Sequence, residues 1–526
     1  MTKTPFITAD KLEQITAEFP TPFHLYDEKG IRETARAVNA AFSWNPGFKE
    51  FFAVKATPNP AILRILKEEG CGVDCATDTE LVMSKKIGFD SSAISFTSND
   101  TRAEEFVYAR DINATINLDA YEDIFFLEEA AGLPETLSLR FNPGGVFSLG
   151  TDIMDHPEES KFGMTKEQLF KGYAYLKEKG VKSFGLHAFL ASNTVTNEYY
   201  PTLAAQLFEL AVEIKNELGV SLDFINLSGG VGVDYTPANK QNDIAVIGEG
   251  VHAKFDEILV PNGLGHISIY TELGRFMTAP HGLVVTKVLH IKDTYRRYVG
   301  VDASAVNLLR PAMYDAYHHI TNMTNPDGDI QVVDVTGSLC ENNDKFAKNR
   351  ELPEARIGDT LVIHDTGAHG FSMGYNYNGR LRSAEILYQE DGTARMIRRA
   401  ETMNDYFATL DGFDFDYRIY RSIVGGSWIL DDFHTLDVGR FDVIQLTDVL
   451  HLPAVDIYNR CTLADHLISI FLLHDTRNML QYIFCRTHLA KHSSCHIGQQ
   501  SFVGLLILRK MSFHHHFAKF FGELIK

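Results

Sequence analysis

From residue 50 to about residue 277, short apolar segments alternate with segments of helical periodicity. The apolar segments are rich in β-branched and aromatic residues, as strands are, and the segments between them are amphipathic at the helical repeat. Eight such strand-helix units in about 230 residues predict a (β/α)8 barrel, whose active site forms where the strands end. A doubly wound open sheet is the alternative. The eight strand candidates are FFAVKA, CGVDCA, AISFTS, ATINLDA, TLSLRFN, FGLHAFL, DFINLSGG and SIYTELG.

After residue 280 the pattern changes to strand-like segments without regular helices between them. This change predicts an α/β barrel over residues 26–279 followed by an all-β domain over residues 280–418. Residues 1–25 are expected to pack on the β domain. The strand candidates of this domain are GLVVTKVLHI, RRYVGVDA, DIQVVDV, GDTLVIHDTG, LRSAEILYQ and ARMIRRAE.

The composition changes again near residue 418. Residues 419–526 hold ten of the 21 histidines and three of the six cysteines. We expect this extension to be a non-catalytic appendage of unknown structure. Residues of metal-ligating types occur at short spacing in Cys485-x2-His488-x3-His492-x2-Cys495. This spacing matches no zinc module, so no metal site is predicted.

The charge and the cysteine content limit the partners and the compartment. A formal net charge of −20 argues against nucleic acid or an anionic membrane as a partner, because both require a basic face. No apolar run reaches transmembrane length, and the first residues lack the regions of a secretory signal. Six cysteines in 526 residues do not make a disulfide framework. We therefore expect a cytoplasmic protein.

Three chemically distinctive groups come at the ends of predicted barrel strands. Lys55 closes the run FFAVKA, and Gly229 and Gly230 follow DFINLS. Glu272 and Arg275 follow SIYT. Taken singly, these groups have plainer interpretations: an exposed or ion-paired lysine, a tight turn and a surface ion pair. Together they match the needs of pyridoxal phosphate, which are a lysine for covalent attachment, backbone N–H groups for the phosphate and a carboxylate for the ring nitrogen.

The predicted β domain carries a second set of candidate side chains. Arg310 and Tyr314, in the run RPAMY, supply a guanidinium and a phenol suited to binding a carboxylate. Cys340 and Glu341 lie on a polar turn after a strand. Most lone cysteines are small core residues, but the polar residues after this one favour a chemical role. His369 lies between glycine-rich neighbours in GAHG, where the plain interpretation is a turn.

In their order along the chain, these motifs resemble those of the fold-type III pyridoxal phosphate decarboxylases, and particularly of the diaminopimelate decarboxylases that make lysine. The resemblance covers about residues 20 to 415. It implies an alanine racemase-like barrel with a C-terminal β domain, a homodimer, and decarboxylation of meso-2,6-diaminopimelate, an amino-acid substrate, to L-lysine. The matching motifs are AVKA at Lys55, SGGVG at 228–232, ELGR at 272–275, RPAMY at 310–314, CENND at 340–344 and GAHGFSMGYNYNGRLRSAEIL at 367–387.

The resemblance also implies roles for individual residues. Lys55 corresponds to the lysine that attaches the cofactor, and Cys340 to the residue proposed to return a proton to the substrate. The segment with Cys340 and Glu341 is implied to complete the active site of the partner subunit. Cofactor contacts are implied for Lys55, Phe189, Ser192, Gly229, Gly230, Glu272, Gly274, Arg275 and His369. Substrate contacts are implied for Arg275, Arg310, Tyr314 and Glu341.

Three residues depart from the family pattern. Phe189 stands where the family has a histidine against the cofactor ring, and a phenylalanine can still stack there. Leu273 replaces a proline, and His369 replaces a tyrosine. These changes bear on fine cofactor contacts and on substrate choice more than on the chemistry.

Single positions separate the related activities. Ornithine-type decarboxylases usually have an aspartate at the position of Glu341, and carboxynorspermidine decarboxylases typically lack the arginine found at Arg275. Racemases of the alanine type place an arginine, rather than a residue like Glu272, against the ring nitrogen. Non-catalytic pyridoxal phosphate carriers resemble the barrel alone. The residues present therefore favour diaminopimelate decarboxylation.

Overall fold

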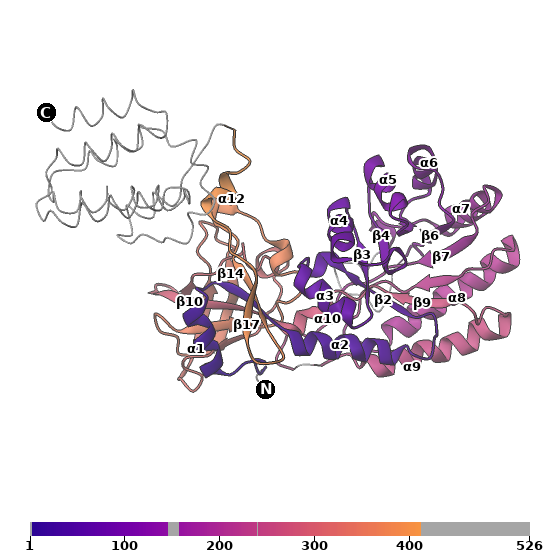
Figure 1. The fold of residues 1–526 in the computed structure, drawn as a ribbon. Helices are drawn as coiled ribbons and strands as arrows, with labels where there is room; N and C mark the ends of the chain where they lie inside the picture. The colour runs from indigo at the N-terminus through magenta and orange to yellow at the C-terminus, as the bar shows by residue number, and fades with distance from the viewer. Residues whose placement is uncertain (1–2, 146–156, 239, 412–526) are drawn as a thin grey trace, which may run out of the picture. The chain divides into compact units, whose positions relative to one another are not determined.

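The computed structural model describes residues 3–145, 157–238 and 240–411 (Figure 1). Most of the predicted barrel and most of the predicted β domain fall within these ranges. The extension at residues 419–526, with Cys485, His488, His492 and Cys495, lies outside the described residues, and so does the domain boundary expected at residue 418.

Eight parallel strands close into a barrel (Figure 1). Each strand pairs with the next along the chain, and β2 pairs with β9 to close the ring. This closure confirms the predicted (β/α)8 barrel and excludes the open doubly wound sheet. The strands are β2 (Lys49–Ala53), β3 (Gly72–Cys75), β4 (Ile94–Thr97), β5 (Thr115–Leu118), β6 (Thr136–Arg140), β7 (Ser183–His187), β8 (Phe224–Asn226) and β9 (Ser268–Thr271).

Helices connect successive barrel strands, and their ends follow local sequence signals. The side chain of Thr77 caps the N-terminus of α4 by accepting a hydrogen bond from Glu80 N, and Gly88 ends the same helix in the left-handed conformation. Thr165 and Gln168 form a capping box at the start of α7. The helices are α2 (Glu28–Ala41), α3 (Pro60–Glu68), α4 (Asp78–Ile87), α5 (Ala103–Asp111), α6 (Tyr121–Ala130), α7 (Lys166–Glu178), α8 (Tyr199–Leu218) and α9 (Ile244–Lys254), followed after β9 by the short α10 (Arg275–Thr278).

A nine-stranded mixed sheet forms the core of the β domain. All six predicted segments of this domain contain strands, which are β10 (Gly282–Asp293), β11 (Arg297–Val301), β13 (Ile330–Thr336), β15 (Thr360–Ile363), β16 (Ala384–Tyr388) and β17 (Ala394–Arg398). The other three strands are β1 (Phe23–Asp27), β12 (Ile320–Asn322) and β14 (Lys345–Pro353). The short helices α11 (Arg310–Tyr314) and α12 (Met403–Phe407) complete the domain.

The N-terminal residues pack against this sheet. Strand β1 lies between β10 and β16, and helix α1 (Ala9–Glu18) buries Leu12 and Ile15. These side chains share an apolar core with Leu283 of β10 and Ile386 of β16. The N-terminus of the described chain therefore belongs structurally to the β-domain sheet. Among the described residues, no helix has the length and apolar character needed to cross a membrane.

The barrel and the β domain meet beside the end of β2. Thr57 Oγ1 donates to Gly367 O at 2.6 Å, and His369 N donates to Ala56 O at 2.9 Å. Asn59 Nδ2 donates to Glu385 Oε2 of β16 at 2.9 Å. These bonds hold the glycine-rich turn of the β domain against the segment that carries Lys55.

Candidate active site

Lys55 lies in a one-turn 3-10 helix, Val54–Ala56, directly after β2. Its neighbours Val54 and Ala56 are buried, whereas the side chain of Lys55 is exposed. The apolar run therefore anchors the backbone and presents the amine at the end of the barrel where the strands stop, as predicted. Its ammonium is close enough to lower the pKa of the buried Glu272 and to oppose the rise in the pKa of Asp74.

Glu272 follows β9 and is buried among hydrogen-bond donors. Asn226 Nδ2 donates to its Oε1 at 2.7 Å, and Ser228 Oγ donates to its Oε2 at 2.8 Å. His187 Nε2 lies 3.3 Å from the same Oε2. Burial alone would raise the pKa of Glu272, but the His187 ring and these hydrogen bonds outweigh it and lower the pKa to about 2. The group is thus a fixed carboxylate, suited to holding a protonated ring nitrogen.

Asp74, at β3, is a second buried acid near this carboxylate. Burial, and then the negative charge of Glu272, raise its pKa well above the ordinary value. The pKa values of these two neighbouring acids are therefore shifted in opposite directions, which favours the negative charge on Glu272 over Asp74. Asp74 Oδ1 is buried and has no hydrogen-bond partner among the described residues.

The glycines after β8 are required by close packing. Gly230 has φ of +109°, and a Cβ there would lie 2.5 Å from the Tyr199 ring. A Cβ on Gly229 would lie 2.9 Å from Glu272 O. Within the described chain, the N–H groups of Gly229 and Gly230 donate to no acceptor. Two adjacent N–H groups at the end of β8 without an acceptor among the described residues fit the phosphate of pyridoxal phosphate.

The other predicted cofactor residues surround this loop. Phe189 is half-buried after β7, and its ring lies 3.7 Å from the position of a Cβ on Gly229. Ser192 follows in the same loop and is half-buried. Gly274 packs against the Lys55 turn, since a Cβ there would lie 2.8 Å from Ala56 Cβ. These positions bring the residues predicted to contact the ring, to bind the phosphate and to attach the cofactor to one end of the barrel.

Two guanidinium groups lie near this end of the barrel. Arg310 begins α11 and is buried, and Arg275 begins α10. Neither forms an ion pair with a carboxylate of the described residues, although a buried cation normally has such a partner. Tyr314, the last residue of α11, is exposed and close enough to Arg310 to influence its pKa.

His369 adopts a left-handed backbone conformation, with φ of +56°, in the turn that contacts Ala56. Burial lowers its pKa well below the usual value, and the nearby Arg275 and Arg310 lower it further. His369 is therefore a neutral imidazole that faces three cations, counting Lys55.

Cys340 and Glu341 belong to the β domain. Both are exposed on the turn between β13 and β14, where Cys340 N donates to Asn378 Oδ1 at 2.6 Å. In the part of the chain that the structure describes, neither side chain forms a hydrogen bond or ion pair with Lys55 or Glu272. Among the described residues, no hydrogen bond, ion pair or ring contact joins Cys340 or Glu341 to the predicted groups of the barrel.

Several polar residues that contact Glu272 or act on it through their charge were not singled out from the sequence. They are polar residues in the second half of predicted strand segments or close to their middle, and a polar residue in an otherwise apolar strand is a signal that could have found them. Arg140, at the end of β6, has its guanidinium carbon 6.0 Å from the Phe189 ring centre and pairs with Asp119 at 2.9 Å. The set comprises Asp74, Arg140, His187, Asn226 and Ser228.

Comparisons with known proteins agree with this geometry. Residues 28–279 match the family model of the pyridoxal-dependent decarboxylase, pyridoxal binding domain. Protein TabA of Pseudomonas amygdali pv. tabaci is 38% identical over 395 residues, which cover 75% of this chain and 92% of the relative. A diaminopimelate decarboxylase of Methanothermobacter thermautotrophicus is 36% identical over 403 residues, covering 76% and 93% of the two chains.

A solved structure shows the same architecture. The diaminopimelate decarboxylase of M. jannaschii in complex with L-lysine matches with a TM-score of 0.70 and 30% identity, over 76% of this chain and 94% of the other. The match spans nearly the whole relative, so it includes both the barrel and the β domain. The chain therefore belongs to the diaminopimelate decarboxylase family of pyridoxal-dependent decarboxylases.

Proposed function

We propose that this protein converts meso-2,6-diaminopimelate to L-lysine and CO2, with pyridoxal phosphate as cofactor. The observation that carries the proposal is the pair of guanidinium groups, Arg275 and Arg310, that lack a carboxylate partner among the described residues near Lys55 and Glu272. A substrate with a second carboxylate would supply the missing anion. The names of the relatives support this substrate.

The residues of the barrel would hold the cofactor. Pyridoxal phosphate, when bound, withdraws electrons from the substrate's α-carbon so that the carboxylate can leave as CO2. Lys55 would attach it covalently, and the N–H groups of Gly229 and Gly230 would bind its phosphate, with Ser192, Gly274, Arg275 and His369 around it. Glu272, ionised and fixed by its donors, would keep the ring nitrogen protonated. Phe189 would pack on the ring face.

The substrate end of the site would use both domains. Arg275, Arg310 and Tyr314 would bind the distal carboxylate, because planar guanidinium groups bind carboxylates through paired hydrogen bonds. Glu341 would bind the distal ammonium group. Cys340 would return the proton to the carbon from which CO2 has left.

Cys340 and Glu341 are exposed and, among the described residues, make no contact with the barrel groups of their own chain, which supports a homodimer with shared active sites. In such a dimer the turn between β13 and β14 of one protomer would enter the site of its partner. We place this enzyme in the cytoplasm, where a soluble amino-acid substrate is available.

A substrate panel tests the activity. The purified full chain, supplied with pyridoxal phosphate, is incubated separately with meso-diaminopimelate, L-ornithine and L-lysine, and the products are separated by chromatography. We expect L-lysine from meso-diaminopimelate and at least a hundredfold lower turnover of the other two. Consumption of another diamino acid with no lysine formed would overturn the substrate assignment.

Mixing two inactive variants tests the shared site. Lys55→Ala and Cys340→Ala are each expected to lose most turnover, and Cys340→Ala should still bind the cofactor. Random exchange of subunits gives heterodimers with one intact site, so about a quarter of the activity should return. If the mixture stays inactive although native mass spectrometry shows heterodimers, Cys340 acts within its own chain.

A further inference from the structure

Tyr235 lies between the two guanidinium groups that lack a carboxylate partner among the described residues. It follows the glycine loop after β8, and its ring is buried. Arg275 Nη1 donates to Tyr235 Oη at 2.7 Å, and the guanidinium carbon of Arg310 lies 4.4 Å from the centre of the ring. One arginine therefore contacts the hydroxyl group, while the other contacts the negative face of the ring.

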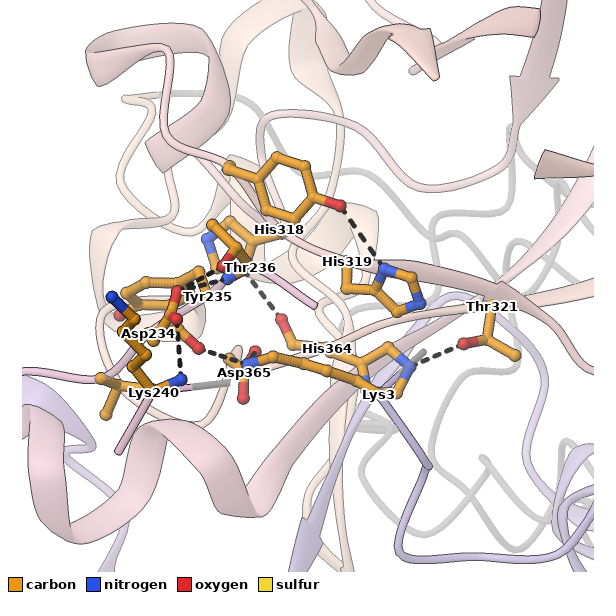
Figure 2. Close-up of polar contacts among 12 residues, drawn as sticks. Lys3, Asp234, Tyr235, Thr236, Lys240, His318, His319, Thr321, His364 and Asp365 are labelled. Atoms are coloured by element: carbon orange, nitrogen blue, oxygen red, sulfur yellow. Dashed lines mark hydrogen bonds and ion pairs between the residues drawn. The ribbon is translucent and has the colours of Figure 1, made fainter. Parts of the chain in front are cut away.

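His318 fixes Arg310 from its other side. Arg310 Nη1 lies 3.0 Å from His318 Nε2, and His318 Nδ1 lies 2.8 Å from His364 O. A guanidinium can only donate, so Nε2 accepts and the ring proton is on Nδ1, which donates to the carbonyl. The His318 ring also contacts Tyr235 edge-to-face, at 4.8 Å between ring centres. His318 is fully buried, and Figure 2 shows it beside Tyr235.

The backbone around Tyr235 is held by charged groups (Figure 2). Lys3 Nζ donates to Asp234 O at 2.5 Å and pairs with Asp365 at 2.5 Å. The carboxylate of Asp234 accepts hydrogen bonds from Thr236 N and Lys240 N, which closes the loop. Tyr235 therefore has a fixed backbone and a fixed ring.

Such a fixed partner is needed because the two arginines repel each other. Burial lowers the pKa of Arg310, and the charge of Arg275 lowers it further. No carboxylate of the described residues separates the two groups. Tyr235 forms a hydrogen bond with Arg275 and a cation–π contact with Arg310, so its position sets the spacing of the two groups.

We propose that Tyr235 and His318 are positioning residues that hold Arg275 and Arg310 at the spacing required to bind a single carboxylate. They thereby select amino acids that carry a second carboxylate at the far end of the chain. This inference rests on the proposed function, since it specifies which residues set the substrate preference of the same site. Displacement by about 1 Å is enough to weaken a paired guanidinium–carboxylate contact.

Two ligands that differ only by the carboxylate test the proposal. L-Lysine, the proposed product, has the distal carboxylate, and cadaverine lacks it. Calorimetric titration of the holoenzyme should show that Tyr235→Phe, which removes the hydroxyl contact with Arg275, weakens lysine binding about tenfold. Cadaverine binding should change less than about twofold, because it makes no use of the arginine pair. In turnover, KM for meso-diaminopimelate should rise while kcat changes little.

Tyr317→Phe is the matched control. This nearby tyrosine stacks on Arg350, with 3.9 Å between the guanidinium carbon and the ring centre, and its hydroxyl lies 3.5 Å from His319 Nδ1. Neither contact involves Arg275 or Arg310. The control variant should bind both ligands as the unmodified enzyme does.

Variants of His318 give a second measurement. His318→Leu removes the acceptor for Arg310 and should weaken lysine binding selectively, whereas His318→Gln keeps an acceptor and should recover much of it. If the unmodified enzyme fails to prefer lysine over cadaverine, the proposed function itself is wrong. If it does prefer lysine but Tyr235→Phe and His318→Leu weaken both ligands equally, or neither, the positioning role is refuted while the function stands.

Discussion

Glu50 is a fully buried carboxyl group next to the residue that would contact the cofactor ring nitrogen. It lies on β2, opposite Thr271 of β9. Its Oε1 accepts a hydrogen bond from Leu273 N at 2.8 Å, and its Oε2 bonds with the hydroxyl of Thr271. Glu50 therefore holds the residues on both sides of Glu272. Burial raises its pKa to about 8, and the charge of Glu272 adds to the rise.

The raised pKa of Glu50 makes stability depend on pH. The folded chain holds this proton up to about pH 8, whereas the unfolded chain loses it near pH 4.5, as an ordinary glutamate does. Folding therefore binds a proton in this window, and the contribution to stability falls by up to roughly 1.4 kcal/mol for each pH unit as pH rises. Glu50→Gln keeps both hydrogen bonds without the titration. The denaturation midpoints of the variant and of the unmodified chain are measured from pH 5 to 8.5. As pH rises, the midpoint of the variant should increase relative to that of the unmodified chain. A difference between the two midpoints that does not change with pH would contradict the prediction.

The positions of Lys55 and Glu272 could be predicted from the sequence because both follow apolar strands, and strand ends meet at one end of a barrel. The residues that donate hydrogen bonds to Glu272 could not be identified in this way. Which strand-end residues face the centre depends on strand tilt and register, so His187 and Asn226 resemble many other polar residues beside strands. Tyr235 lies in a loop without periodicity, and only its tertiary contacts distinguish it.

At the level of elements, α9 crosses α2 at a glycine. Gly248 lies in the middle of α9, and a Cβ there would lie 2.3 Å from Ala41 O. Alanine favours a helix over glycine by about 1 kcal/mol, but this overlap with backbone must push the helices apart. Gly248→Ala should therefore lower the thermal midpoint. The exposed Ala253 of the same helix is the control, because Ala253→Gly measures the propensity difference alone. A higher thermal midpoint for Gly248→Ala than for the unmodified chain would contradict this prediction, because it would show that α2 and α9 can move apart without a loss of stability.

Burial made most strands predictable, although the buried strand β1 was not predicted. The barrel strands and β10 are rich in apolar residues and stand out in the sequence. Strand β14, with the sequence KFAKNRELP, was not predicted, since it lies at the edge of the sheet and pairs only with β13 among the described strands. Edge strands carry charged residues that protect the open edge, and this hides their periodicity.

At the scale of the whole described molecule, the N-terminus links the barrel to the β domain. Lys3 contacts Asp234 of the barrel and Asp365 of the β domain, and its side chain is only 7% exposed. This contact could not be predicted, because a single lysine near a terminus has no pattern. Burial raises the pKa of Asp365 despite the nearby ammonium group, so this carboxylate is costly to keep charged.

Removal of Lys3 should therefore destabilise the chain mainly by leaving Asp365 charged and unpaired. Lys3→Met should lower the free energy of unfolding by about 3 kcal/mol, measured as a lower midpoint in denaturant. Adding Asp365→Asn should restore most of the lost free energy of unfolding, because it removes the unpaired charge. Asparagine also tolerates the φ of +57° at this position. Lys348→Met, which breaks the exposed pair with Asp315, should change little. If the double variant remains as unstable as Lys3→Met, the bond from Lys3 to Asp234 O, rather than the unpaired charge, holds the two domains together.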